Sequence, residues 1–140
     1  MNFQSVPIGD LLFSIHKELK RTLERNLKPF EIGIGQLQIL LLFYSDMEES
    51  YTQREITLAL GVDKGNISRS IQKLMEKNFI NFCEKDHRAY RLTEAGKDLK
   101  SAISNEFFNI HEKMCDGLDV QALRITSQTL SSIQERLEKL

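Results

Sequence analysis

Several polar and small side chains are spaced so that they share one face of a short helix. Ile67, Ile71 and Leu74 fall at positions i, i+4 and i+7, the pattern of an inward-facing apolar stripe. The outward positions and their neighbours are Lys64, Gly65, Asn66, Ser68, Arg69, Gln72 and Lys73. Arginine can hydrogen-bond the O6 and N7 atoms of guanine or clamp a phosphate, and Asn and Ser suit adenine edges or phosphates. A solvated polar face would explain any one of these residues, but it explains the set poorly, so we expect a face that reads duplex DNA.

A second group of residues opens the helix before this one. Thr52 and Glu55 have the spacing of a capping box, in which each side chain accepts from the other residue's backbone amide. The free amides beside Thr52, Gln53 and Arg54 would then face a backbone phosphate at the positive end of the helix dipole. The apolar positions expected to face the core are Ile56, Ala59 and Leu60.

The two helices are joined by a tight turn and followed by a hairpin. Gly61 suits the left-handed residue that ends the first helix, and Asp63 can cap the second. From Ile80 to Leu92 apolar and polar residues alternate around a polar centre, which predicts two short strands and a turn. Helix, turn, helix and hairpin in this order are typical of a winged helix-turn-helix.

Helices are expected on both sides of this core. Apolar spacings of three and four predict one over residues 8–27, a near-continuous apolar run predicts a central one near 35–46, and Thr93 can cap a long one that breaks near Gly117. Asp119 can cap the last helix, whose apolar positions follow a heptad. Such a heptad either packs on its own subunit or mediates self-association. The predicted fold class is mainly α with a small β hairpin, in one domain over residues 1–140.

Charge is distributed unevenly along the 140 residues. The net charge is −1, but residues 52–91 hold eight Lys and Arg against five acids, whereas the remainder holds eleven against fifteen. This distribution favours a nucleic-acid partner for the middle of the chain, although a fluctuation of surface charge is the plain alternative. The longest apolar run is too short to span a bilayer, and two cysteines do not make a disulfide framework, so we expect a cytoplasmic protein without a membrane partner.

Two ordered motifs resemble the MarR family of winged helix-turn-helix transcriptional regulators. The run from Leu60 to Ile80 looks like the recognition helix of that family, and Asp86-His87-Arg88 followed by Leu92-Thr93-Glu94-Ala95-Gly96 is similar to its wing and next helix. The resemblance implies a DNA-binding lobe over 35–92 and helical dimerisation regions over 1–30 and 97–140. It implies a homodimer that acts as a repressor and reads a pseudo-palindromic operator mainly through Ser68 and Arg69. The implied dimerisation residues are Leu11, Ile15, Leu123, Leu130, Ile133 and Leu137.

The wing departs from the family pattern. The stretch from Ile80 to Thr93 is a few residues shorter than usual, so Arg88 either enters the minor groove, as in the family, or touches only the backbone. The resemblance also implies a small-molecule effector such as an aromatic acid. Tyr44 and His16 are candidates to line its site, and core packing is the alternative role for Tyr44.

The sequence contains no motif that is typical of a catalytic or metal-binding site. No nucleophile elbow, phosphate-binding loop, dinucleotide turn or HExxH helix is present, so we expect neither an enzyme nor a cofactor. His16, His87 and His111 lack metal-ligand spacing, and Cys83 and Cys115 would need a low pKa and exposure to act as redox switches. The alternative function is a winged-helix protein interaction module that does not bind DNA.

Overall fold

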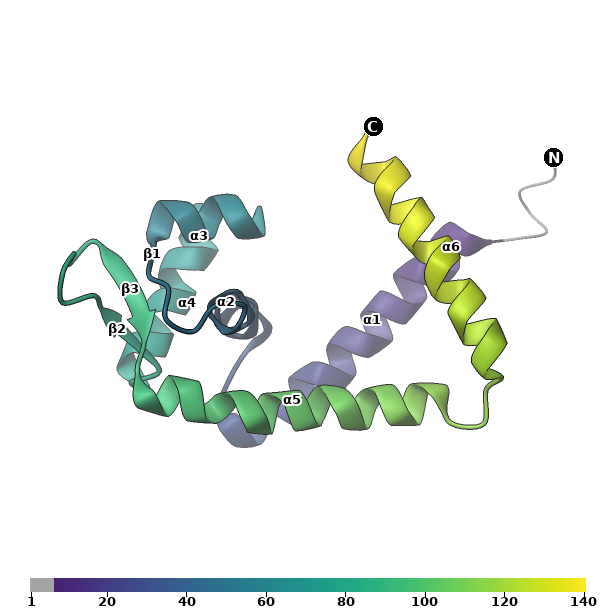
Figure 1. The fold of residues 1–140 in the computed structure, drawn as a ribbon, viewed down its shortest axis with the longest axis horizontal. Coiled ribbons are helices and arrows are strands. Elements are labelled where there is room, and N and C mark those ends of the chain that lie inside the picture. The colour runs from purple at the N-terminus through teal and green to yellow at the C-terminus, as the bar shows by residue number, and fades with distance from the viewer. Residues whose placement is uncertain (1–6) are drawn as a thin grey trace. The chain divides into compact units, whose positions relative to one another are not determined.

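The computed structural model describes residues 7–140, which form six α-helices and one small sheet (Figure 1). The elements are α1 (Ile8–Leu27), η2 (Lys28–Phe30), α2 (Ile34–Tyr44), β1 (Tyr51–Thr52), α3 (Gln53–Leu60), α4 (Lys64–Glu76), β2 (Ile80–Phe82), β3 (Ala89–Leu92), α5 (Glu94–Cys115) and α6 (Val120–Glu138). They fall into two compact units, the first ending at Ile103 and the second running from Ser104 to Leu140. The predicted fold class, mainly α with a small β hairpin, is confirmed.

The first unit is built around α2, whose predicted central position is confirmed. Ile39, Leu40 and Phe43 are fully buried, and α2 packs against α1, α3 and α4. The inward stripe of α4 is also buried, with Ile67, Ile71 and Leu74 each at most 3% exposed. The outward face of α4 is therefore fixed by packing on its other side.

One expectation for α3 is wrong. Ile56 is fully buried, but Ala59 is exposed and Leu60 only half-buried. The helix has eight residues and contacts α2, α4 and β1 along only part of its circumference. A single large side chain therefore anchors it, and its later turn lies at the surface.

The sheet has three antiparallel strands in the order β1-β3-β2. The hairpin β2–β3 agrees with the alternating pattern, and its register pairs Ile80 with Leu92 and Phe82 with Tyr90. The pairing of Tyr51 in β1 with Tyr90 was not predicted. A strand of two residues contains too few positions to show alternation, which is why the sequence did not reveal it.

The hairpin leads directly into α5 through a tightly packed junction (Figure 1). The hydroxyl of Thr93 donates to the carbonyl of Asn78 (2.6 Å) and accepts from the amide of Gly96 (3.0 Å), which confirms Thr93 as the helix cap. A Cβ atom at Gly96 would lie 2.1 Å from the carbonyl oxygen of Phe79, so only glycine fits there. The Tyr44 hydroxyl donates to the carbonyl of Gly96 (2.8 Å), which ties α2 to the same point.

The second unit contains the last part of α5 and all of α6. Gly117 has a φ of 75° and separates the two helices, and the side chain of Asp119 accepts from the amide of Ala122, as expected of a cap. No residue of α6 is buried. Its apolar residues are therefore exposed or half-buried in the single chain.

Candidate nucleic-acid interface

The start of α4 is fixed by two local features that were predicted from the sequence. Gly61 adopts the left-handed conformation, with a φ of 62°, and ends α3. The carboxylate of Asp63 accepts from the amide of Asn66 (3.3 Å) and caps α4. With the apolar stripe buried behind it, α4 exposes Lys64, Asn66, Ser68, Arg69, Gln72 and Lys73, and Gly65 is half-buried among them.

Two of the predicted base-reading residues are joined to each other. The guanidinium of Arg69 donates from Nη2 to the Oδ1 atom of Asn66, one turn earlier on α4. A Cβ atom built on Gly65 would lie 3.4 Å from Nη1 of Arg69, so the missing side chain leaves room for the guanidinium. In the free chain Arg69 therefore lies back along α4 toward its N-terminus, where a recognition helix enters the major groove.

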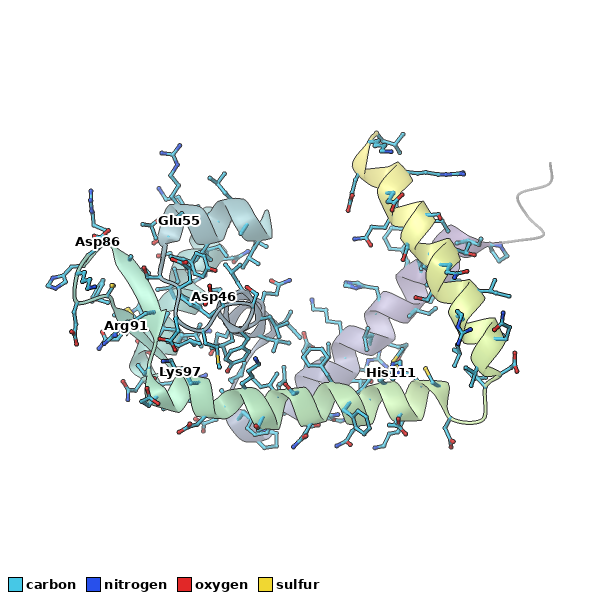
Figure 2. The ribbon with its side chains drawn as sticks, viewed as in Figure 1. Asp46, Glu55, Asp86, Arg91, Lys97 and His111 are labelled. Carbon is cyan, nitrogen blue, oxygen red and sulfur yellow. The ribbon has the colours of Figure 1, made fainter. Side chains whose placement is uncertain are left out.

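The start of α3 is organised by the predicted capping box. The hydroxyl of Thr52 accepts from the amide of Glu55 (3.2 Å), and the carboxylate of Glu55 accepts from the amide of Thr52 (3.3 Å). Figure 2 shows Glu55 at this end of the helix. The box occupies the hydroxyl of Thr52, so what α3 can offer a phosphate are the amides of Gln53 and Arg54 and the exposed Arg54 side chain.

The wing is a compact turn between β2 and β3. The amide of Ala89 donates to the carbonyl of Asp86 (3.0 Å), which places His87 and Arg88 at the corner. The carboxylate of Asp86 accepts from the amide of Arg88 (3.0 Å), and this bond holds the pKa of Asp86 below its usual range. The Arg88 side chain is 90% exposed with its Nε atom 3.4 Å from Asp86. Figure 2 shows Asp86 near the tip and Arg91 closer to α5.

The role of Asp86 was missed from the sequence, although a signal for it exists. An Asp whose carboxylate binds the amide two residues later forms an Asx-turn, and Asp86-His87-Arg88 has that spacing. The turn holds the backbone of Arg88 while leaving its side chain in solvent.

The basic residues of the middle segment divide into three groups. Arg88 and Arg91 pair with Asp86 and Glu84 in the hairpin. Lys77 is half-buried and donates to the buried side chain of Gln36 (2.8 Å) and to the carbonyl of Glu31, so it joins the end of α4 to the start of α2. The third group contains the other exposed cations: Arg54, Lys64, Arg69 and Lys73 on the two helices, and Lys85 in the hairpin turn. The charge available to a partner is thus concentrated on α3 and α4.

The other candidate residues lie outside this face. Tyr44 is buried, its hydrogen bond to Gly96 places it in the core, and burial raises its pKa to about 12. His16 is exposed on α1. Cys83 follows β2 directly, and hydrogen bonds from the amides of Lys85 and Asp86 lower its pKa. Over residues 7–140, no three His, Cys, Asp or Glu side chains converge as metal ligands, and no helix is long and apolar enough to cross a membrane.

Helix, left-handed turn, capped second helix and short hairpin together define a winged helix-turn-helix protein. Comparison with known proteins shows which proteins this chain is similar to. Residues 32–89 match the model of the MarR family. The chain is 24% identical over 110 residues to the HTH-type transcriptional regulator BilQ of Clostridioides difficile (strain CD3), an alignment that covers 76% of this chain and 73% of that protein.

Solved structures share the fold over nearly the whole chain. A MarR transcriptional regulator from Methanosarcina mazei Go1 superposes with a TM-score of 0.82 at 23% identity, covering 94% of this chain and 96% of the other. A MarR mutant from E. coli complexed with operator DNA gives a TM-score of 0.74 at 20% identity, with coverages of 94% and 96%. Residues 32–89, which hold the helix-turn-helix and most of the hairpin, therefore match the MarR family, and the chain has the fold of solved MarR structures.

Proposed function

We propose that this protein is a sequence-specific regulator that binds duplex DNA as a homodimer and represses transcription from a pseudo-palindromic operator. The observation that carries the proposal is the face made by Arg54, Lys64, Arg69 and Lys73 on α3 and α4, where exposed cations surround polar side chains that suit base edges. Phosphate contacts would come from Gln53, Arg54 and Lys73, and base contacts from Ser68 and Arg69.

The homodimer is supported by the second unit. An amphipathic helix is normally stabilised by burying its apolar face, yet α6 leaves Ile125, Leu130 and Leu137 at least 39% exposed. Leu123 and Ile133 are half-buried in the same helix, and Leu11 and Ile15 on α1 are 57% and 45% exposed. A second copy of the chain would cover such faces. Two copies then present two recognition helices, which suits an operator with two-fold symmetry.

Repression would follow from binding itself, because a dimer bound over a promoter prevents RNA polymerase from binding there. Release from the operator by a small-molecule effector, such as an aromatic acid, belongs to the same proposed function.

The test is the salt dependence of binding to duplex DNA. Neutralising several phosphates releases counterions, so we expect the logarithm of the association constant to fall linearly with the logarithm of salt concentration, with a slope of about −4 or steeper for a dimer. Fluorescence anisotropy with a random duplex measures it. Binding that is absent at low salt, or flat across salt concentrations, would contradict the proposal and favour a protein interaction module.

A further inference from the structure

Lys77, the residue that ends α4, is bonded to the segment between α1 and α2, residues 28–33, which we call the connector. Its Nζ atom donates to the backbone carbonyl of Glu31 and to the Oε1 atom of Gln36 (2.8 Å). Gln36 is only 6% exposed, and both acceptor atoms are uncharged. In the described part of the chain, Lys77 takes part in no ion pair. Its charge is therefore bound by neutral oxygens, one of them buried.

The carbonyl of Glu31 lies at the end of the helical segment that begins with α1. Helix α1 runs directly into η2, and Glu31 follows η2 in the left-handed conformation, with a φ of 58°. The amide of Ile32 donates to the carbonyl of Leu27 (3.4 Å), and both of these side chains are buried. Carbonyls at a helix C-terminus lack partners within the helix and carry partial negative charge. An ammonium at this point is stabilising, and it holds the end of α1 against the end of α4.

A second close approach joins the start of α2 to α4. A Cβ atom at Gly35 would lie 2.7 Å from the hydroxyl oxygen of Ser70, which is closer than real side chains approach. The first turn of α2 therefore lies on α4 with no side chain between them. Ser70 and Lys77 are seven residues apart, about two helical turns. Gly35 and Gln36 thus contact α4 at two points along its length.

The end of α4 also contacts the start of α5. The carbonyl of Asn78 accepts from the hydroxyl of Thr93 (2.6 Å), and the amide of Thr93 donates to the carbonyl of Phe79 (3.1 Å). The three residues 77–79 therefore contact the connector through the first of them and α5 through the other two. Helix α1 and the later part of α5 belong to the proposed dimerisation regions. An orientation imposed by the dimer would reach the recognition helix at these three residues.

We propose that Lys77 is a positioning residue for operator binding, which fixes the orientation of α4 relative to α1 through its bonds to Glu31 and Gln36. It acts without contacting DNA. In a dimer the two recognition helices are related by the symmetry axis, so a rotation of α4 relative to α1 changes the separation of both half-sites at once. Lys77 therefore sets the half-site spacing that the dimer prefers. This spacing role rests on the proposed function, whereas the restraint on the connector does not.

The first measurement is amide hydrogen exchange of the full chain, without DNA. Lys77→Met keeps an aliphatic side chain but has no ammonium. Exchange at the amides of Glu31 and Ile32 should become about tenfold faster, since a hydrogen bond to a charged group is lost at the connector. Amides at Ile71 and Leu74, on the buried stripe of α4, should keep their rates. Lys77→Arg retains donors and charge, so it should restore most of the protection.

The second measurement is the preference for half-site spacing. An operator is selected from random duplexes with the natural chain, and anisotropy compares it with duplexes that have one base pair inserted or removed between the half-sites. Lys77→Met should reduce the preference for the selected spacing by about 2- to 30-fold, the usual range for residues that couple two regions. Lys73→Gln is the matched control. It removes an exposed cation of the same helix, so it should weaken binding at every spacing and leave the preference unchanged.

Two outcomes would overturn the inference. If Lys77→Met lowers affinity equally at every spacing, as expected of Lys73→Gln, Lys77 is a phosphate contact and does not position α4. If exchange quickens equally at the connector and at Ile71, Lys77 stabilises the lobe in general and restrains no particular segment. A natural chain that binds no duplex would refute the proposed function and the spacing role with it. The exchange rates would still decide whether Lys77 restrains the connector.

Discussion

At the scale of single residues, the bond between Arg69 and Asn66 bears on the proposed base contacts. The sequence presents the two as independent readers, but the structure joins them through Nη2 and Oδ1. The guanidinium has five N–H donors, so Arg69 could contact a base while it keeps this bond, and Asn66 would then hold the guanidinium in position. The two residues should therefore act on affinity together.

We expect Arg69→Ala to weaken binding to the best operator by about 1–3 kcal/mol and to relax preference at one base pair. Because the pair is coupled, Asn66→Ala combined with Arg69→Ala should cost less than the two single changes added together. Anisotropy titrations with an operator and a single-base variant measure both effects. Equal losses on strong and weak sites would show that Arg69 meets only phosphate.

Tyr44 gives a prediction about pH. Its phenol is protonated in both folded and unfolded chains below pH 10, but burial raises the folded pKa to about 12, against 10.0 for a free phenol. Unfolding therefore releases a proton between these pH values, and stability should fall by roughly 2–3 kcal/mol as pH rises from about 10 to about 12.

The measurement is the difference in unfolding free energy between the natural chain and Tyr44→Phe, followed across this pH range. The difference should shrink as pH rises, because the variant has no phenol to ionise. Tyrosinate absorbance of the folded chain should also lose its last-titrating component in Tyr44→Phe. A constant difference across the range would contradict a buried, hydrogen-bonded phenol.

At the scale of elements, α4 depends on its cap. Asp63 accepts from the amide of Asn66 and is followed at once by Lys64 and Gly65, so the capped turn is also the turn that faces the proposed partner. Loss of the cap should loosen the start of the recognition helix before it affects the buried stripe behind it.

Asp63→Ala should lower the free energy of unfolding by about 1 kcal/mol, whereas Asp63→Ser should retain most of it, because serine caps equally well. Chemical denaturation monitored by circular dichroism gives the comparison. Asp63→Ser as destabilising as Asp63→Ala would mean that the carboxylate stabilises the fold by something other than capping.

At the scale of the whole molecule, the proposed self-association rests on exposed apolar residues of the second unit. Leu130 lies on α6, is 39% exposed, and occupies a heptad position. A charge at the centre of an apolar interface is left without a partner when the copies associate. In the single chain the same charge would remain in solvent.

Leu130→Asp should therefore convert a dimer to a monomer in sedimentation velocity while the helical content of the chain stays unchanged. Gln128→Asp, at an exposed polar position of the same helix, is the matched control and should remain dimeric. A Leu130→Asp chain that still sediments as a dimer would place the interface elsewhere.

Most elements could be predicted from local patterns, because each has its own start and stop signals. The Thr52–Glu55 box, Gly61, Asp63, Thr93 and Asp119 mark helix ends through bonds made within a few residues. What could not be predicted are contacts between segments distant in sequence. The bond from Lys77 to Gln36 uses one of the eight basic residues counted in the middle segment, and β1 forms only because β3 lies beside it.

The candidate interface was predictable in its residue types but not in its internal contacts. Periodicity gives the outward face of α4, because the inward stripe is apolar. It cannot show that Arg69 contacts Asn66 or that Arg88 contacts Asp86, since both depend on rotamers.

The junction at Gly96 has a mechanical consequence. The backbone of α5 at Gly96 lies against the carbonyl of Phe79. The hydroxyl of Thr93 bonds the carbonyl of Asn78 just after α4, and the hydroxyl of Tyr44 in α2 bonds the carbonyl of Gly96. A hinge needs backbone that is free to change its dihedral angles, and these contacts restrain the backbone at Gly96. The first turn of α5 and α4 are therefore expected to move together as one rigid body. A displacement of the start of α5 would therefore rotate the helix-turn-helix lobe as a whole and would not change its internal geometry.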